Sequence, residues 1–256
     1  MDCNIIMKFF KIIFTFYALI IFIALMLVVF PLALLAMFRG RVKGGNMIYR
    51  LCMIWGDLWF ALTFINVKKI YEGSNQNDKP YIYVANHISY LDTPLIVKAI
   101  RHPLRPLGKV EMSKVPVFGY IYKNAIVTVD RSSPENRARS LSLLKAYLKK
   151  KISILVFPEG TFNETHRPLK DFFSGAFKIA IETKTPIKPV LFLDTFDRMP
   201  YTSLFSLNPG KCRVVYLPEV EVNDYNIEDV ELLKQTVYQM MEKKLLEYKV
   251  SWIENS

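Results

Sequence analysis

The feature that most constrains the fold is an unbroken apolar run near the N-terminus. Residues 12–38 are 27 consecutive positions without a charged side chain. An uncharged run longer than about 18 residues is a candidate membrane helix, and this one would extend about 40 Å against a hydrocarbon core of about 30 Å. Pro31 lies within the run, where it can kink or break a helix. We therefore expect an N-terminal helical segment that associates with a membrane.

The flanks of this run allow two arrangements in the membrane. Lys8 and Lys11 precede it, and Arg39, Arg41 and Lys43 follow it. Because basic residues favour the cytoplasmic side, the slightly richer downstream flank places the rest of the chain on the cytoplasmic side of the inner membrane. The near symmetry also allows a half-inserted hairpin. A cleaved signal peptide is disfavoured, because the run is too long and lacks a small-residue cleavage site.

Composition favours a membrane surface as the partner of this chain. The sequence is 52% hydrophobic and carries a formal net charge of +11. This combination fits an anionic membrane better than nucleic acid, for which the sequence has no recognisable motif. Cys3, Cys52 and Cys212 are widely separated and have neither a metal-ligand spacing nor a disulfide pattern. We expect a reducing compartment, no metal site and no bound cofactor.

A second apolar stretch at residues 47–65 has two interpretations. It contains Trp55 and Trp59, and it is interrupted by Arg50 and Asp57. Tryptophans and scattered charges are typical of a helix at a membrane interface. A core helix packed on the following domain fits the same pattern equally well.

Beyond a polar segment, the chain alternates between strand and helix patterns. Residues 73–79 predict a linker between an anchoring segment at 1–72 and a domain at 73–256. Alternation of this kind indicates an α/β fold, so we predict a mixed sheet flanked by helices. The expected strands are residues 81–84, 107–109, 125–129, 152–157, 187–192 and 212–216. The expected helices are residues 95–100, 133–150, 175–183 and 227–250.

Two residues with catalytic potential directly follow the first of these strands. His87 and Asp92 are five positions apart, which on an ideal helix would separate their directions by about 140°. A contact between them therefore requires a turn at or before a helix start. In that turn His87 could act as a general base while Asp92 holds its tautomer. The alternative is a half-buried histidine bonded to a turn aspartate. Of the remaining histidines, His102 is expected to face solvent and His166 lies in a polar loop.

The strand at 152–157 ends abruptly in Pro158-Glu159-Gly160-Thr161. A tight loop after a buried strand is a usual position for a binding site in an α/β protein. Gly160 would let backbone N–H groups approach a ligand, and Glu159 could accept a hydrogen bond from a hydroxyl. An ordinary exit from a strand is the alternative interpretation.

Together these stretches resemble the glycerolipid acyltransferase family, with the closest similarity to the 1-acylglycerol-3-phosphate acyltransferases. Four sequence blocks match in the order of the family and cover about residues 81–190. The matching residues are Asn86-His87-x4-Asp92, then 108–111 with 115–119 and 129–131, then 157–161, and finally 186–190.

The resemblance implies a membrane enzyme that transfers a fatty acyl group from a thioester donor to the free hydroxyl of a lyso-phospholipid. The expected acceptor is 1-acylglycerol-3-phosphate, giving phosphatidate, and the expected donor is acyl-CoA or acyl carrier protein. His87 would be the base and Asp92 its orienting acid, without an acyl-enzyme. Backbone N–H groups around Gly160 and Thr161 are candidates for the oxyanion site. The residues expected to bind the acceptor are Asn86, Lys109, Arg131, Glu159, Gly160 and Thr161.

Two departures from the family pattern bear on the acceptor. Phe162 stands where many relatives carry a basic residue, and Phe173 stands where many carry a lysine, with Lys170 displaced upstream. With fewer cations near an acceptor phosphate, a phosphate-free lyso-aminolipid, such as an ornithine or glycine lyso-lipid, is an alternative acceptor. Two further alternatives are a thioesterase that transfers the acyl group to water and a membrane lipid-binding protein without catalytic activity.

Overall fold

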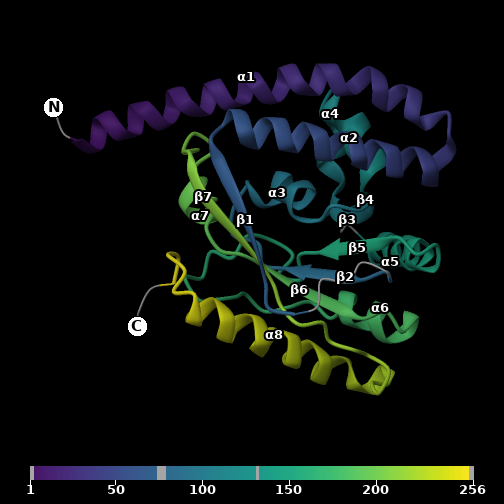
Figure 1. The fold of residues 1–256 in the computed structure, drawn as a ribbon. Coiled ribbons are helices and arrows are strands. Elements are labelled where there is room, and N and C mark those ends of the chain that lie inside the picture. The colour runs from purple at the N-terminus through teal and green to yellow at the C-terminus, as the bar shows by residue number, and fades with distance from the viewer. Residues whose placement is uncertain (1–2, 74–78, 131–132, 254–256) are drawn as a thin grey trace.

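The computed structural model describes residues 3–73, 79–130 and 133–253. Its centre is a seven-stranded sheet in the order β1-β7-β6-β2-β5-β3-β4 (Figure 1). Neighbouring strands are parallel except for β6 and β7, which are antiparallel. The predicted mixed sheet flanked by helices is confirmed. The strands are β1 (Ile65–Tyr71), β2 (Ile82–Ala85), β3 (Leu104–Lys109), β4 (Val127–Val129), β5 (Ser153–Val156), β6 (Ile187–Phe192) and β7 (Gly210–Tyr216).

Helices cover both faces of the sheet (Figure 1). The helices are α1 (Cys3–Met37), α2 (Gly40–Leu62), α3 (Asp92–Ala99), α4 (Phe118–Ala125), α5 (Pro134–Lys149), α6 (Gly175–Thr183), α7 (Thr195–Arg198) and α8 (Val230–Glu247), with 3-10 turns η1 (Val110–Lys114) and η2 (Ile227–Asp229). Because side chains alternate along a strand, β2 serves two cores. Tyr83 and Ala85 pack toward the core shared with α1 to α4, whereas Ile82 and Val84 pack toward the core shared with α5, α6 and α8.

The second apolar stretch is a core helix, as one of its two interpretations predicted. Helix α2 lies between α1 and the sheet (Figure 1) and buries Trp55 and Trp59. The Trp59 indole donates to the Ala18 carbonyl at 2.9 Å, and the Tyr49 hydroxyl donates to the Ile100 carbonyl at 3.1 Å. These two bonds connect α2 upward to α1 and downward to the α/β layers.

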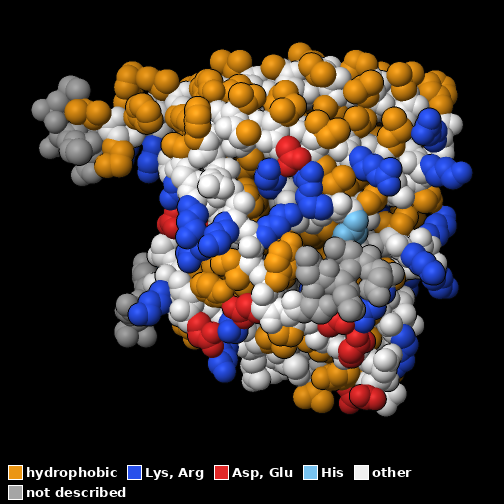
Figure 2. Space-filling model, in the orientation of Figure 1, with side chains coloured by type: hydrophobic (Ala, Val, Ile, Leu, Met, Phe, Trp, Pro, Cys, Tyr) orange, Lys and Arg blue, Asp and Glu red, His pale blue; other side chains and the backbone are white. Residues whose placement is uncertain are grey.

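Helix α1 is continuous through Pro31 and presents a broad apolar surface. It is long and apolar enough to cross a membrane, and most of its side chains are not covered by the rest of the chain. Figure 2 shows the exposed hydrophobic side chains as a nearly continuous band along the top of the molecule. An exposed apolar surface of this extent is unusual for a protein in water, so it indicates association with a membrane.

Strand β1 was not expected from the sequence. It pairs in parallel with β7, from Ile65 beside Gly210 to Tyr71 beside Tyr216. Lys68 and Lys69 obscure its apolar alternation, as is common on edge strands. The sheet therefore takes one strand from the segment 1–72. Most of the expected linker at 73–79 lies outside the described residues.

The other predicted elements differ mainly at their ends. Ser133 caps α5 as predicted, because its hydroxyl accepts the Asn136 N–H at 3.2 Å. Ala125 ends α4 instead of starting a strand, so that prediction was wrong. The solvent-facing position expected for His102 was also wrong. Its side chain is half-buried with Nε2 3.3 Å from the Ser153 hydroxyl, and burial lowers its pKa.

Candidate active site

The two sequence motifs meet at one edge of the sheet. Strands β2 and β5 are parallel neighbours, so the loops that follow them leave from the same edge. His87 comes two residues after the end of β2, and Glu159 comes three residues after the end of β5. The Asn163 N–H donates to the His87 carbonyl at 2.8 Å, which joins the two loops directly. Residues about 70 positions apart therefore form one site.

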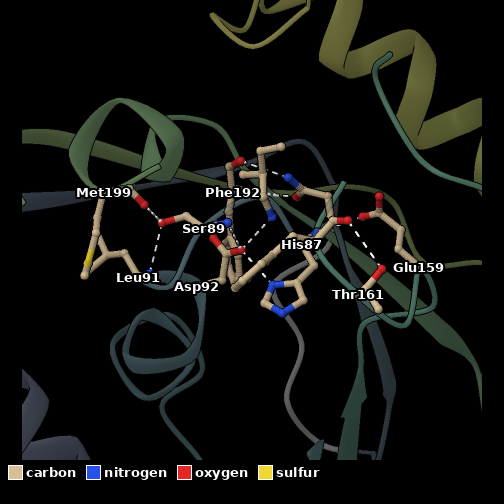
Figure 3. A network of polar contacts seen from close by, with 11 residues as sticks. His87, Ser89, Leu91, Asp92, Glu159, Thr161, Phe192 and Met199 are labelled. Atoms are coloured by element: carbon tan, nitrogen blue, oxygen red, sulfur yellow. Dashed lines mark hydrogen bonds and ion pairs between the residues drawn. The ribbon is translucent and has the colours of Figure 1, made fainter. Parts of the chain in front are cut away.

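His87 and Asp92 are in contact, as the spacing predicted. Their Nδ1 and Oδ2 atoms are 2.9 Å apart (Figure 3). The same carboxylate oxygen accepts the N–H groups of Ile88 at 2.7 Å and Ser89 at 2.8 Å. Asp92 is fully buried in the first turn of α3, where a negative charge is favoured by the helix dipole. The Asp92 carboxylate is therefore held in place by three hydrogen-bond donors.

This contact decides which nitrogen of His87 is available for chemistry. The Asp92 carboxylate accepts a hydrogen bond from Nδ1–H, so the single proton of the neutral ring stays on Nδ1 and Nε2 carries none. The imidazole is 18% exposed and its Nδ1 is bonded to Asp92, so Nε2 is the nitrogen left for a substrate. Nearby Ser89 is buried, with its hydroxyl donating to the Met199 carbonyl and accepting the Leu91 N–H. His87 is therefore the candidate base of this loop, because the neighbouring Ser89 hydroxyl is engaged in structural contacts.

Aromatic rings enclose the imidazole. The His87 ring stacks on Phe157 with centroids 4.2 Å apart, and Phe162 lies 4.4 Å away on a tilted plane. Phe162 in turn meets Tyr90 at 4.8 Å. In the sequence, Phe162 was notable only because many relatives carry a basic residue at this position. The fold makes it, with Phe157, an apolar wall of the site.

Glu159 is buried and bonded to the backbone of both loops. It is 1% exposed, and its oxygens accept the His87 N–H at 2.7 Å and the Lys170 N–H at 2.9 Å. Burial raises the pKa of this carboxyl to about 8, although the two backbone hydrogen bonds act in the opposite direction. These contacts give Glu159 a positioning role beneath His87. Its expected contact with the acceptor hydroxyl stays a prediction.

The turn after Glu159 depends on a glycine. Gly160 has φ of 75°, a conformation that costs little only without a β-carbon. Its N–H donates to the Phe157 carbonyl at 3.1 Å and is therefore already used in the turn. The expected oxyanion role thus fits the Gly160 N–H poorly. The exposed hydroxyl of Thr161 accepts a hydrogen bond from the Lys170 ammonium at 3.0 Å.

Asn86 is engaged with the neighbouring strand. Its amide donates to the Phe192 carbonyl at 3.1 Å and accepts the Phe192 N–H at 2.8 Å, so it extends the pairing between β2 and β6. It is 1% exposed, and its contacts support the loop that carries His87. A substrate contact for Asn86 stays a prediction.

One of the two expected cations lies on a neighbouring strand, and the other lies outside the described residues. Lys109 is exposed at the end of β3, which pairs in parallel with β5, so it belongs to the same edge of the sheet. Arg131 lies outside the described residues. Within the described ranges, no group of three or more His, Cys, Asp or Glu side chains is arranged to hold a metal ion.

Sequence comparison identifies the class of protein that this fold and site define. Residues 64–193 match the sequence model of the Acyltransferase family. The 1-acyl-sn-glycerol-3-phosphate acyltransferase of Salmonella typhimurium is 31% identical over 208 residues, or 79% of each chain. The enzyme of the same name from Escherichia coli is 30% identical over 168 residues, or 65% of this chain and 67% of the relative. The chain therefore belongs to the acyltransferase family.

Structural comparison agrees over nearly the whole length. The crystal structure of the 1-acyl-sn-glycerophosphate acyltransferase PlsC from Thermotoga maritima has a TM-score of 0.78 and 26% sequence identity. The match covers 97% of this chain and all of that chain, so it includes both N-terminal helices. The protein is an acyltransferase, and its relatives are named for acyl transfer to 1-acylglycerol-3-phosphate.

Proposed function

We propose that the protein transfers a fatty acyl group from a thioester donor to the free hydroxyl of 1-acylglycerol-3-phosphate, giving phosphatidate. The observation that carries this proposal is the His87–Asp92 pair, with a buried acid, an accessible Nε2 and a neighbouring loop that carries Glu159. The relatives named for this reaction support the choice of acceptor. The proposed donor is acyl-CoA or acyl carrier protein, and the reaction needs no cofactor.

In the proposed mechanism the acceptor is itself the nucleophile. Nε2 of His87 removes the proton of the lipid hydroxyl as that oxygen attacks the thioester carbonyl carbon. A new C–O bond forms, and the carbonyl oxygen becomes an oxyanion. The intermediate then collapses with cleavage of the C–S bond, and the leaving thiolate takes the proton back from the imidazolium. Asp92 stabilises the imidazolium between these two steps.

The apolar surface of α1 supports a location at the membrane, where both the acceptor and the product reside. We place the catalytic domain on the cytoplasmic side of the inner membrane, because a thioester donor is made in the cytoplasm and the downstream flank of α1 is basic. Asn86, Lys109, Arg131, Glu159, Gly160 and Thr161 remain the proposed acceptor-binding positions.

A phosphate-free lyso-aminolipid is the second candidate acceptor. The contact between Phe162 and the His87 ring favours it, because an aromatic ring occupies the place where many relatives carry a cation. The intact pair of His87 and Asp92 argues against a lipid-binding protein without catalytic activity. A thioesterase would not need a site for an acceptor lipid.

The test uses the purified full chain in mixed micelles with a palmitoyl thioester donor. Lysophosphatidate, a lyso-ornithine lipid and no acceptor are compared, and the products are identified by mass spectrometry. Phosphatidate as the main product, absent with His87→Ala, would support the proposal. Preferential acylation of the lyso-ornithine lipid would replace it with the second candidate, and free fatty acid at the same rate without acceptor would indicate a thioesterase.

A further inference from the structure

The side chain of Lys170 reaches the turn that follows β5, although Lys170 is nine residues beyond the end of the sequence block at 157–161. Its ammonium donates to the Thr161 hydroxyl at 3.0 Å. The segment between Thr161 and Lys170 thus closes on itself, because residues nine positions apart are in contact. A lysine that looks displaced in the sequence is therefore adjacent to the site in the fold.

The backbone of Lys170 is fixed to the same group as the catalytic loop. Its N–H donates to Oε2 of Glu159 at 2.9 Å, while the His87 N–H donates to Oε1 of that carboxyl at 2.7 Å. Thr161 precedes Phe162, whose ring lies 4.4 Å from the His87 ring. A short series of contacts consequently connects the ammonium of Lys170 to the imidazole that removes the acceptor proton.

The ammonium of Lys170 contacts a hydroxyl rather than a carboxylate, although its charge acts to lower the pKa of the nearby Glu159. This ammonium forms no ion pair with the described carboxylates, and both oxygens of Glu159 face backbone N–H groups. The side chain is half-buried, so water reaches it. An ammonium has three N–H donors, and one bond to Thr161 leaves donors for an incoming anion.

We propose that Lys170 binds the phosphate of the acceptor and replaces the cation that is missing at Phe162. This assignment rests on the proposed function and adds a specificity-determining residue to it. In this proposal Phe162 and Lys170 have separate roles. Phe162 supplies an apolar wall beside the imidazole, and Lys170 supplies the positive charge from the far end of the same loop.

The experiment compares Lys170→Gln and Lys170→Arg with the wild-type chain. Each is assayed with lysophosphatidate and with a 1-acylglycerol of the same chain length, diluted in micelles of a neutral detergent. Lys178→Gln is the matched control, because Lys178 is an exposed lysine on α6 and its removal changes the net charge equally. Values of KM and kcat are measured for both acceptors at low and high salt.

We expect Lys170→Gln to raise KM for lysophosphatidate about 10-fold with little change in kcat, because a hydrogen bond from a charged group is lost at a partly exposed position. Lys170→Arg should stay close to the wild type. The KM for 1-acylglycerol should not change, and Lys178→Gln should match the wild type with both acceptors. High salt should weaken the preference for lysophosphatidate in the wild type more than in Lys170→Gln.

Two results would overturn the assignment of Lys170 alone. Equal losses with both acceptors would mean that Lys170 only supports the Thr161 turn, and unchanged KM values would mean that the phosphate binds elsewhere. A wild-type chain that does not acylate lysophosphatidate would overturn the proposed function itself, and the Lys170 assignment with it. The wild-type arm therefore separates these failures.

Discussion

The loop after β2 and the loop after β5 contribute differently to the site. In the first, Asp92 is fully buried and its Oδ2 is bonded to three donors within 2.9 Å. In the second, Glu159 is buried with both oxygens bonded to backbone N–H groups, whereas Thr161 is exposed and Phe162 and Lys170 are half-buried. The chemistry is therefore held by buried contacts that tolerate little change. The side chains that we propose to select the acceptor are more exposed, so exchanging them should disturb these buried contacts less.

The largest effect should come from the base itself. His87→Ala should lower the rate of acyl transfer about 10²- to 10⁴-fold, the usual contribution of a general base. The loss of rate in Asp92→Asn should lie in a similar range, because the amide no longer favours the correct tautomer or stabilises the imidazolium. Initial rates in mixed micelles check both changes. His166→Ala, at an exposed histidine, is the control, and full activity of His87→Ala would contradict the mechanism.

Removing the carboxyl that joins the two loops should cost stability as well as activity. Glu159→Ala leaves the N–H groups of His87 and Lys170 without their acceptor in a buried place. Each unsatisfied group costs about 1–3 kcal/mol, so the free energy of unfolding should fall by about 2–6 kcal/mol. Chemical denaturation monitored by circular dichroism measures this. Glu164→Ala, at an exposed position, should change it little, and an equal effect would show that burial is not the cause.

The raised pKa of Glu159 predicts a pH dependence with a definite sign. Burial favours the neutral acid, so its stabilisation is complete below the ordinary carboxyl pKa and is lost as pH rises through about 8. The midpoint temperature of thermal unfolding should therefore decrease as the pH is raised from about 5 to about 9. It should fall less in Glu159→Gln, which has no charge to bury. Parallel curves for the two proteins would contradict the burial argument.

The smallest effects should come from the two proposed phosphate-binding cations. Lys109→Ala should lower the catalytic efficiency for lysophosphatidate several-fold, because an exposed ammonium is well screened by water. Arg131→Ala should lower it more, about 10- to 100-fold, if the planar guanidinium binds phosphate through two hydrogen bonds. Lys149, which precedes β5 at the opposite edge of the sheet, provides a control substitution. A larger loss for Lys109→Ala than for Arg131→Ala would reverse this assignment.

Several elements could be predicted because their causes are local. The cap of α5 follows from Ser133 and the proline after it, and the contact between His87 and Asp92 follows from a short turn before a helix. Strand β1 could not be predicted in this way. Its partner β7 lies about 145 residues further along the chain, and its lysines hide the alternation. The position of His102 also depended on a distant strand, since Ser153 begins β5.

The sequence by itself determined the mixed α/β fold, the apolar N-terminal helix and the contact between His87 and Asp92, the proposed base and its acid. These features depend on periodicity, on length and on residues within one turn of each other. Only the tertiary structure decided that Glu159 joins the two loops, that Phe162 packs against the imidazole and that Lys170 returns to Thr161. Those contacts form between residues on different strands and along a folded loop, where spacing in the chain does not set distance in space.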